Sequence, residues 1–409
     1  MSRGALSHVT VLDLSRVLAG PWAGQILGDL GAEVYKIERP GSGDDTRTWG
    51  PPFLRDAAAG GAAGDAAYYL CTNRNKKSVT VDFTTAEGRE IVRALAARAD
   101  VVIENFKVGG LKAHGLDYEA LRRLNPRLIY CSITGFGQTG PYAARPGYDF
   151  LIQAMGGLMS VTGAKDGAPG AGPQKAGVAL TDILTGLYAT IGILAALAHR
   201  ERSGEGQYID VALLDVQVAC LANQAMNYLV SGTPPVRMGN AHPNIVPYQD
   251  FPTADGHMIV AVGNDAQFAR LSAELGRPDL PLDPRFASNA ARVANRDALI
   301  AAIRAATVAR TTADWIARLE RAQVPCGPIN ALDAVFADPQ VRARGLRLDL
   351  PHPAAGSVPQ VASPLRLSAT PVRYGNAPPT LGADTRTVLR DVLRLGESAI
   401  DALAAKKIV

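Results

Sequence analysis

Cysteine is scarce in this chain, and its spacing gives no support to the sites that cysteine usually builds. The four cysteines, Cys71, Cys131, Cys220 and Cys326, form no CxxC pair, and the six histidines are scattered. We therefore expect no metal site and no metal cofactor. So few thiols in 409 residues are typical of a reducing compartment, and we expect a cytoplasmic protein.

Leader segments and long uncharged runs are also missing. Residues 1–13 contain no apolar core of the signal-peptide kind. Between Ala176 and His199 the single charge is Asp182, and the uncharged stretch after it is shorter than the roughly 20 residues of a membrane helix. We expect a buried helix there and no membrane partner.

Charge of one sign is not in strong excess either. The net charge is +4 and charged residues make up 20% of the chain, which does not favour a nucleic-acid partner. The nucleotide fingerprints GxGxxG, after the first strand, and GxxxxGK[ST] are absent as well. Apolar residues make up 47%, enough for a large core.

What is present is an alternation of strands and helices, which predicts an α/β fold built from parallel βαβ units. The expected strands are 9–13, 33–37, 78–82, 101–103, 128–133 and 207–211, and the expected helices are 20–30, 86–98, 148–159, 181–200 and 213–230. Residues 51–64, rich in Gly and Ala, are expected to form a mobile loop. The basic run Asn73–Lys77 is typical of a solvated turn.

Composition predicts three regions along the chain. A large α/β domain occupies 1–231, and a smaller α/β domain follows at 232–330 with a strand at 257–262 and helices at 265–275, 292–307 and 312–322. Residues 331–409 are expected to return to the large domain, with a proline-rich extended segment at 351–379 and a helical stretch at 385–405.

Asp182 is the first candidate for chemistry because it stands alone among small and apolar residues. A desolvated carboxylate has a raised proton affinity and is a better nucleophile than a solvated one. The ordinary alternative is a helix N-cap, since Asp commonly caps helices. Both interpretations stay open from the pattern alone.

Four other segments are candidates for ligand binding, and each has an ordinary loop as its alternative. Three of them follow predicted strands, where open α/β sheets bind ligands. They are 36–44 with Arg39, 104–107 with Asn105, Phe106 and Lys107, and the glycine-rich turn 135–142. The fourth, 239–249, has the composition of a lid and contains Gly239, Asn240 and His242.

Taken together and in order, these segments resemble the class III CoA-transferases, the family of formyl-CoA transferase and carnitine CoA-transferase. The resemblance is carried by VLDLSRVLAGPWAGQILGDLGAEVYKIERPGSGDDTR, NRNKKSVTVDF, VIENFKVGGL, GPYAARPGYDFLIQAMGGLMSVTG, VALTDILTGLYATIGILAAL, GEGQYIDVALLDV, VPCGPIN and LGADT. The segments NFKVGGLKAHGLDY, GPQKAGVALTDILTGLY, VQVACLANQAMNYLVSG and GNAHPNIVPYQDFPTADG resemble the branch that uses succinyl-CoA and dicarboxylic acids.

The resemblance implies a large Rossmann-like domain, a small α/β domain and an interlocked homodimer. It also places Asp182 at the family's catalytic aspartate. The implied reaction moves CoA from an acyl-CoA donor, succinyl-CoA in this branch, to a free carboxylic acid through an aspartyl–acyl anhydride, with no cofactor besides CoA as substrate.

Individual ligand contacts carry over by the same resemblance. Ala19, Arg39, Val81, Asn105 and Phe106 match CoA contacts of formyl-CoA transferase, and Trp49 and Tyr148 match aromatic residues of its active site. A glutamine on its acceptor side is Leu18 here, which argues against oxalate or formyl substrates. A lysine and an arginine of its CoA site are Thr84 and Ala113 here, and Lys107, Lys112 or Arg145 are candidates to replace their charge. The turn at Gly239 and Asn240 is a candidate oxyanion site.

Two other functions are compatible with this resemblance. α-Methylacyl-CoA racemase uses a histidine in a GHD segment, but this chain has Tyr148 in Gly147–Asp149. Tyrosine, with a reference pKa near ~10, is a poor base at neutral pH. A protein that binds CoA without catalysis is the other alternative, and the intact setting of Asp182 argues against it.

Overall fold

The structure is a computed structural model that describes residues 4–56 and 60–409. The chain divides into two compact units, each described below by itself. The first comprises Met1–Leu158, Ala176–Ala225 and Gln340–Val409, and the second comprises Met159–Lys175 and Met226–Pro339. The second unit thus takes in residues 159–175, which lie within the predicted first domain.

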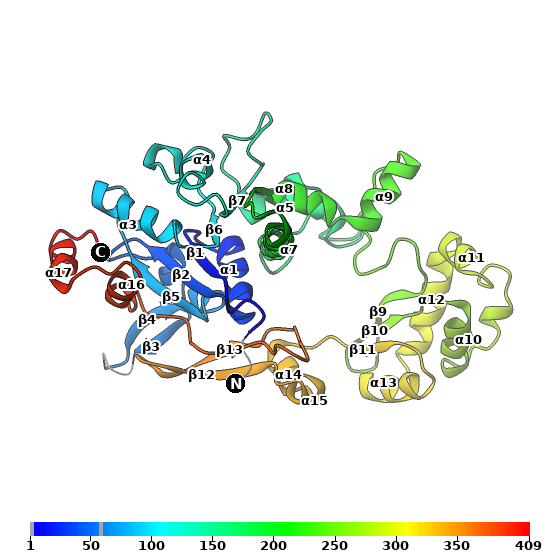
Figure 1. Cartoon of the computed structure of the whole chain (residues 1–409). Helices are drawn as coiled ribbons and strands as arrows, with labels where there is room; N and C mark the ends of the chain where they lie inside the picture. Colours follow the sequence, from blue (N-terminus) through cyan, green and yellow to red (C-terminus); the bar gives the residue numbers. More distant parts are fainter. Residues whose placement is uncertain (1–3, 57–59) are drawn as a thin grey trace. The chain divides into compact units, whose positions relative to one another are not determined.

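A six-stranded parallel sheet forms the centre of the first unit (Figure 1). Its strands are β1 (Thr10–Asp13), β2 (Glu33–Glu38), β5 (Lys76–Thr80), β6 (Val101–Glu104), β7 (Ile129–Thr134) and β8 (Tyr208–Ala212). They lie in the order β5-β2-β1-β6-β7-β8, and every neighbouring pair is parallel. This is the Rossmann strand order, with its switch point between β1 and β6. The predicted α/β class with a parallel sheet is confirmed.

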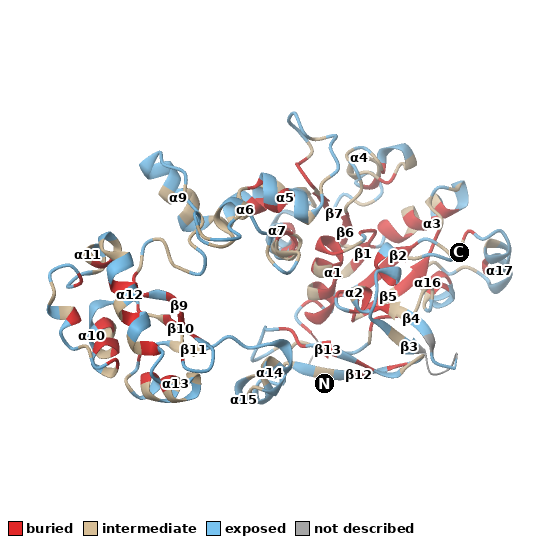
Figure 2. Ribbon diagram, turned by 180° about the vertical axis from the view of Figure 1, so that it is seen from behind, coloured by how far each residue is buried: buried red, intermediate tan, exposed pale blue. Residues whose placement is uncertain are grey.

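Helices cover both faces of this sheet, which explains why strands such as β1, β6 and β7 are rich in apolar residues. On one face, α1 (Ala19–Asp29), α7 (Leu180–Ser203) and α8 (Leu213–Ala219) share a core with Val11 and Ile103. On the other face, α3 (Ala86–Ala96), α4 (Tyr118–Leu121), α16 (Thr385–Asp391) and α17 (Glu397–Ala405) share a core with Leu12 and Val102. The buried sheet and α1 are red in Figure 2. The C-terminal helices therefore pack on the large sheet.

The long helix α7 is apolar enough to cross a membrane by length and composition alone, but 44% of its most apolar window is buried within the structure. Ala189, Ile193 and Leu197 belong to the sheet's core cluster. These contacts are those of a core helix.

The second unit has its own antiparallel sheet, in the order β11-β10-β9, and its own core of Phe251, Val260, Phe268, Leu299 and Trp315. Its elements are β9 (Tyr248–Pro252), β10 (His257–Ala261), β11 (Cys326–Pro328), α10 (Asp265–Glu274), η3 (Leu280–Leu282), α11 (Asn289–Ala294), α12 (Arg296–Thr307), α13 (Thr312–Arg321) and α14 (Leu332–Ala337). The strand predicted at 257–262 is β10.

Four segments predicted as single helices are interrupted, and one of them, 292–307, is divided between α11 and α12 at Asn295. Residues 148–159 form α5 (Asp149–Met155) and the start of α6 (Leu158–Val161), with Gly157 at φ +86° between them. Residues 213–230 form α8 and α9 (Ala222–Ser231), because Ala222 takes φ +47°. Residues 385–405 form α16 and α17, separated where Arg394 takes φ +61°. Left-handed residues of this kind cannot be read from periodicity.

Two hairpins were not predicted. β12 (Arg347–His352) and β13 (Gly356–Val361) pair within and beside the expected extended segment. β3 (Phe53–Asp56) and β4 (Ala62–Ala66) pair where a mobile loop was expected, and residues 57–59 of that loop lie outside the described residues. The remaining short elements are η1 (Asp45–Thr48), α2 (Ala67–Leu70), η2 (Lys112–His114) and α15 (Pro339–Ala343).

Candidate active site

Two loops meet at the switch point of the large sheet. One follows β1 and leads into α1, and the other follows β6. The side chain of Asn105 joins them, because its Oδ1 accepts the Arg16 amide at 2.8 Å and its Nδ2 donates to the Arg16 carbonyl at 2.7 Å. The Arg16 guanidinium lies over the Phe106 ring at 5.3 Å and pairs with Asp45 at 3.0 Å.

A cavity opens beside these loops at the carboxyl ends of β1, β2 and β5. Arg39, Val81 and Phe106, three of the predicted CoA contacts, line it. Arg39 is exposed, and the structure gives its side chain no hydrogen bond or ion pair within 4–56 and 60–409. Thr84, which replaces a family lysine, also lines the cavity. The cavity thus combines an apolar wall with a cation that is available to a phosphate.

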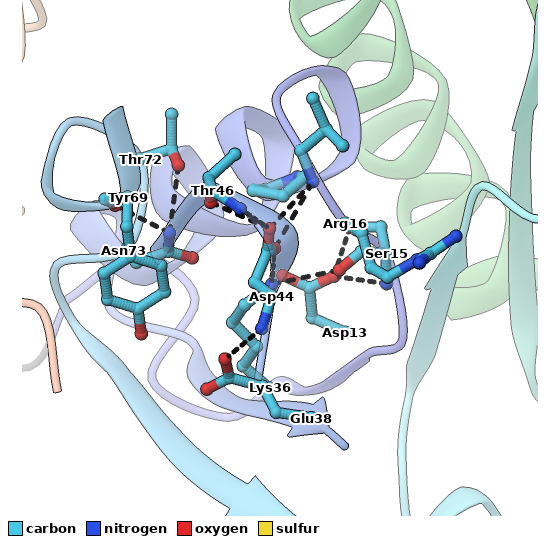
Figure 3. Close-up of polar contacts among 12 residues, drawn as sticks. Asp13, Ser15, Arg16, Lys36, Glu38, Asp44, Thr46, Tyr69, Thr72 and Asn73 are labelled. Carbon is cyan, nitrogen blue, oxygen red and sulfur yellow. Dashed lines mark hydrogen bonds and ion pairs between the residues drawn. The ribbon is translucent and has the colours of Figure 1, made fainter. Parts of the chain in front are cut away.

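The wall behind this cavity is a network of buried charges, and Figure 3 shows its polar contacts. The Lys36 ammonium bonds to the Asp44 carboxylate at 2.8 Å, and both side chains are fully buried. Lys76 and Asp13 form a second buried pair at 2.9 Å. The prediction of a solvated turn at Asn73–Lys77 is therefore wrong, because Asn73, Arg74 and Lys76 are buried.

This network fixes the start of α1. Val17 takes φ +71°, a strained conformation for a β-branched residue, and its amide donates to both Asp44 oxygens at 3.3 Å. Burial disfavours the charge of Asp44, but the Lys36 ammonium and hydrogen bonds from Lys36 and Thr46 outweigh it and lower the pKa of Asp44 to about 2. Asp44 therefore stays ionised and holds the loop that presents Leu18 and Ala19.

A second, smaller cavity lies beside the carboxyl end of β6 and the first residues of β7 and β8. Lys107 and Lys112 line it, together with Glu104 and an aromatic group of Tyr118, Tyr130 and Tyr208. Burial raises the pKa of Glu104 to about 7, although hydrogen bonds from Ser132 and the Phe106 amide oppose the rise. Its carboxyl accepts the Phe106 amide at 2.8 Å, so it also sets the loop of the first cavity.

Asp182 lies in the first turn of α7 but does not cap it. The N-cap residue is Ala179, and no side chain of that residue bonds the helix. Asp149 of α5 supplies the cap instead, accepting the Thr181 amide at 2.8 Å and the Asp182 amide at 3.3 Å through Oδ1. The structure gives the Asp182 carboxylate no hydrogen bond within 4–56 and 60–409. The capping interpretation of Asp182 is therefore wrong.

Two effects raise the pKa of Asp182 to about 7. Burial is the larger, and the negative charge of Asp149 adds to it. The first turn of a helix would have the opposite effect, because its dipole favours an anion. A carboxylate that is both ionisable near neutrality and free of hydrogen bonds has the properties of a nucleophile.

An aromatic pair lies close to Asp182. The charge of Asp182 contributes, after burial, to raising the pKa of Tyr68 to about 12, which places the two side chains within electrostatic range. Trp49, a predicted lining residue, packs edge-on against Tyr68 at 5.4 Å. Tyr68 was missed from the sequence because its segment, α2, lies next to a loop that was expected to be mobile.

Leu18 and Ala19 form the start of α1, Leu18 as its N-cap residue and Ala19 as its first residue. A Cβ at Gly186 would lie 2.7 Å from the Ala19 carbonyl oxygen and 3.0 Å from the Trp22 Cβ. Glycine there lets α1 cross α7 one turn after Asp182. The structure thus places the start of α1, with the predicted CoA contact Ala19 and the predicted lining residue Leu18 next to it, beside the helix of the nucleophile.

Two other predicted site residues of the first unit, Tyr148 and Arg145, line neither of the two cavities. Tyr148 is 66% exposed at the start of α5. Arg145 stacks on Phe136 and Tyr142.

Gly239, Asn240 and His242 belong to the second unit, whereas Asp182 belongs to the first. The side-chain Nδ2 of Asn240 donates to the Asp250 carboxylate at 3.0 Å, and burial and the charge of Arg296 lower the pKa of His242. In the described part of the chain, no group of three or more His, Cys, Asp or Glu side chains is placed to hold a metal.

Comparison with known proteins gives one consistent family. The model of CoA-transferase family III matches residues 6–385. The chain is 54% identical to succinate–glutarate CoA-transferase of Agrobacterium fabrum, over 96% of this chain and 97% of that protein. It is 44% identical to succinyl-CoA:glutarate CoA-transferase of Homo sapiens, over 99% and 90%. The crystal structure of a CAIB/BAIF family protein from Brucella suis superposes with a TM-score of 0.84 at 52% identity, over 96% of this chain and all of that one.

Proposed function

The chain belongs to CoA-transferase family III, and we propose that it moves CoA from succinyl-CoA to a dicarboxylic acid, with glutarate as the first acceptor to test. It is an enzyme of this family, and the resemblance stated from its motifs is confirmed. The choice of substrates is supported by the activities that name its relatives. The single structural observation that supports a transferase is Asp182, a half-buried carboxylate without hydrogen-bond partners whose pKa is raised to about 7.

In the proposed mechanism Asp182 carries the acyl group. Its carboxylate oxygen attacks the thioester carbon of succinyl-CoA, the C–S bond breaks, and CoA leaves as the thiolate. The acceptor carboxylate then attacks the aspartyl carbonyl of this anhydride and displaces succinate, which forms a second anhydride. The thiolate finally attacks the acceptor carbonyl and regenerates the Asp182 carboxylate. No proton is gained or lost overall, and each anhydride retains the free energy of the thioester.

The two cavities suggest how CoA is bound. Phe106, Val81 and Arg39 in the first cavity offer a flat ring, an apolar wall and a phosphate partner. Lys107 and Lys112 in the second cavity are the candidates to replace the missing family cations, because the structure gives neither side chain a hydrogen bond or ion pair within the described residues. Arg145 is the weaker candidate because it stacks on two aromatic rings.

We also propose a homodimer. Leu187, Tyr188, Ile191 and Leu194 of α7 are each 36–59% exposed, at the spacing of one helix face. Phe150 adds an exposed ring on α5. Side chains of this kind are usually covered in an assembly. In the proposed dimer, Gly239 and Asn240 supply the backbone amides that stabilise the oxyanion of each attack.

A CoA-exchange assay tests the proposal. Purified protein is incubated with succinyl-CoA and each of several dicarboxylic acids, and new thioesters are identified by mass. We expect glutaryl-CoA from glutarate, and acylation of Asp182 when the acceptor is omitted. Asp182→Ala is expected to bind CoA but to exchange nothing.

The matched control is Asp215→Ala, which removes an exposed aspartate from the first turn of α8. If Asp182→Ala exchanged CoA at the wild-type rate, the assignment of Asp182 as the nucleophile would be wrong. Deuterium uptake at the α-carbon of a branched acyl-CoA, without exchange, would instead favour a racemase.

A further inference from the structure

Asp149 is tied to the nucleophile through the backbone. Its Oδ1 accepts the amides of Thr181 and Asp182 at 2.8 and 3.3 Å, which are the second and third residues of α7. A capping residue normally precedes its own helix by one position. Here the cap comes from α5, a different helix, so the orientation of the first turn of α7 depends on Asp149.

Gln153, one turn further along α5, fixes Asp149. Its Nε2 donates to Asp149 Oδ2 at 2.7 Å, and its Oε1 accepts the Ala176 amide at 2.8 Å. The Gln153 side chain is fully buried. Both oxygens of Asp149 thus accept hydrogen bonds, whereas the Asp182 carboxylate receives none within residues 4–56 and 60–409.

Within residues 4–56 and 60–409, the elements that pack on the start of α7 bring no cation to this pair of carboxylates. The elements that pack on the start of α7 carry few charges: α5 has Asp149, α8 has the exposed Asp215, and α1 has only Asp29 at its far end, bonded to Arg74. β7 has no charged residue, and Asp210 of β8 accepts the Gln138 amide. The remaining titratable neighbour is the phenol of Tyr68 on α2. Asp149 is therefore the one charge that acts on Asp182 at close range within residues 4–56 and 60–409.

We infer that Asp149 is a positioning residue for the transfer reaction: it takes over the cap of α7, leaves the Asp182 carboxylate without hydrogen bonds, and holds a second negative charge beside it. The inference rests on the proposed function, since it assumes that Asp182 is acylated.

The chemical consequence concerns both protonation and acylation. Each of these events neutralises the Asp182 carboxylate, so each relieves the repulsion from Asp149 by the same amount. Asp149 should therefore favour formation of the aspartyl–succinyl anhydride, in which the Asp182 oxygen binds the succinyl carbon and CoA leaves as the thiolate. One interaction thus makes the nucleophile more basic and its acylated form more stable.

The test compares Asp149→Asn with the double variant Asp149→Asn/Gln153→Glu. The Asn oxygen can still accept the α7 amides, so the first variant removes the charge and keeps the cap. In this variant the Gln153 NH2 group faces the NH2 group of the new asparagine, and neither can accept a hydrogen bond. In the double variant, Gln153→Glu supplies an acceptor for the asparagine NH2 and returns one negative charge to the cluster. Asp215→Asn is the control for loss of an exposed carboxylate.

The readout is the burst of CoA thiol released from succinyl-CoA without acceptor, measured from pH 5 to 9 together with the unfolding midpoint of each variant. For Asp149→Asn we expect the acid limb to move to lower pH by about half a unit or more, and the acyl-enzyme equilibrium to fall by the matching factor, at roughly tenfold per unit. The double variant should restore part of both shifts.

If the acid limb of the pH profile stayed in place while the burst rate fell, Asp149 would act only as a structural cap, and the inference would be wrong. A shifted limb with an unchanged acyl-enzyme equilibrium would overturn it as well. Asp182→Ala separates this failure from that of the proposed function, because a burst in that variant would show that Asp182 is not acylated at all.

Discussion

Removing the charge of Asp44 should destabilise the first unit by an amount that its pKa predicts. The pKa falls from 3.8 to about 2 in the folded chain. At about 1.4 kcal/mol per unit, this depression corresponds to roughly 2.5 kcal/mol of stability at neutral pH. Because the Lys36 and Asp44 side chains are fully buried, solvent screening does not reduce this value. We expect Asp44→Asn to lower the free energy of unfolding by about 2–3 kcal/mol.

The sign of the pH dependence follows from the same shift. The folded pKa of Asp44 lies below its unfolded value, so its contribution is complete above pH 3.8 and is lost as the pH falls through about 2. The difference in stability between the parent protein and Asp44→Asn should therefore be constant near neutrality. It should shrink once the pH falls below 3.8.

Urea unfolding followed by tryptophan fluorescence can measure the free energy of unfolding of the first unit. The chain has three tryptophans, and Trp315 is the one in the second unit. In a Trp315→Phe background, the signal of Trp22 and Trp49 reports the first unit. A cycle with Lys36→Met and the double variant isolates the pair, for which we expect a coupling energy of about 2 kcal/mol. Asp44→Asn within about 0.5 kcal/mol of its parent, or no coupling, would refute the electrostatic argument.

Three further outcomes follow from the site. Gly186→Ala should lower both stability and exchange activity, since a Cβ there meets the Ala19 carbonyl oxygen at 2.7 Å, and overpacking of about 1–3 kcal/mol exceeds the helix-propensity gain of about 1 kcal/mol. Gly192→Ala should keep both, because the nearest atom, Ile209 Cγ2, lies at 3.3 Å and is a side-chain atom rather than backbone; thermal unfolding and the exchange assay test both variants. Glu104→Ala should raise the KM for succinyl-CoA several-fold with little change in kcat, because the Phe106 amide loses its acceptor at a cost of about 1–3 kcal/mol; steady-state kinetics with Glu104→Gln as the conservative control will test this. The value of kcat/KM should rise with pH through about 7, where the Asp182 carboxyl ionises, and a profile flat from pH 5 to 9 would contradict that assignment.

The strands and the nucleophile could be predicted from sequence because their signals are local. Strands such as β1, β6 and β7 are short and rich in apolar residues, and Asp182 is conspicuous as the single charge in its segment. The partners of Asp182 could not be predicted this way. Asp149 lies 33 residues earlier in the chain, and its bond to the Asp182 amide arises only when α5 and α7 are packed together.

The prediction of a solvated turn at Asn73–Lys77 failed for a related reason. Lys36, Lys76 and Asp13 stand in or beside strands, where a charged residue normally faces solvent. Here both lysines meet carboxylates contributed by other segments, at 2.8 and 2.9 Å. Composition records the charges but not their pairing, and only pairing makes their burial tolerable. The left-handed residues Ala222 and Arg394, which break two predicted helices, are likewise properties of packing rather than of local pattern.

Asp44 and Asp182 show that surroundings, and not residue type, assign the two carboxylates their roles. Burial acts on both in the same direction and disfavours the charge. Lys36 reverses that effect at Asp44, whereas Asp149 reinforces it at Asp182, so the pKa values separate to about 2 and about 7. The helix dipole at Asp182 contributes only about 0.3–1 kcal/mol, less than one pH unit, and cannot offset a rise of about three units. Asp44 therefore remains a fixed anion that shapes the loop before α1. Asp182 can lose its charge near neutral pH, and a carboxylate of that basicity is suited to attack a thioester and to be released again from the anhydride.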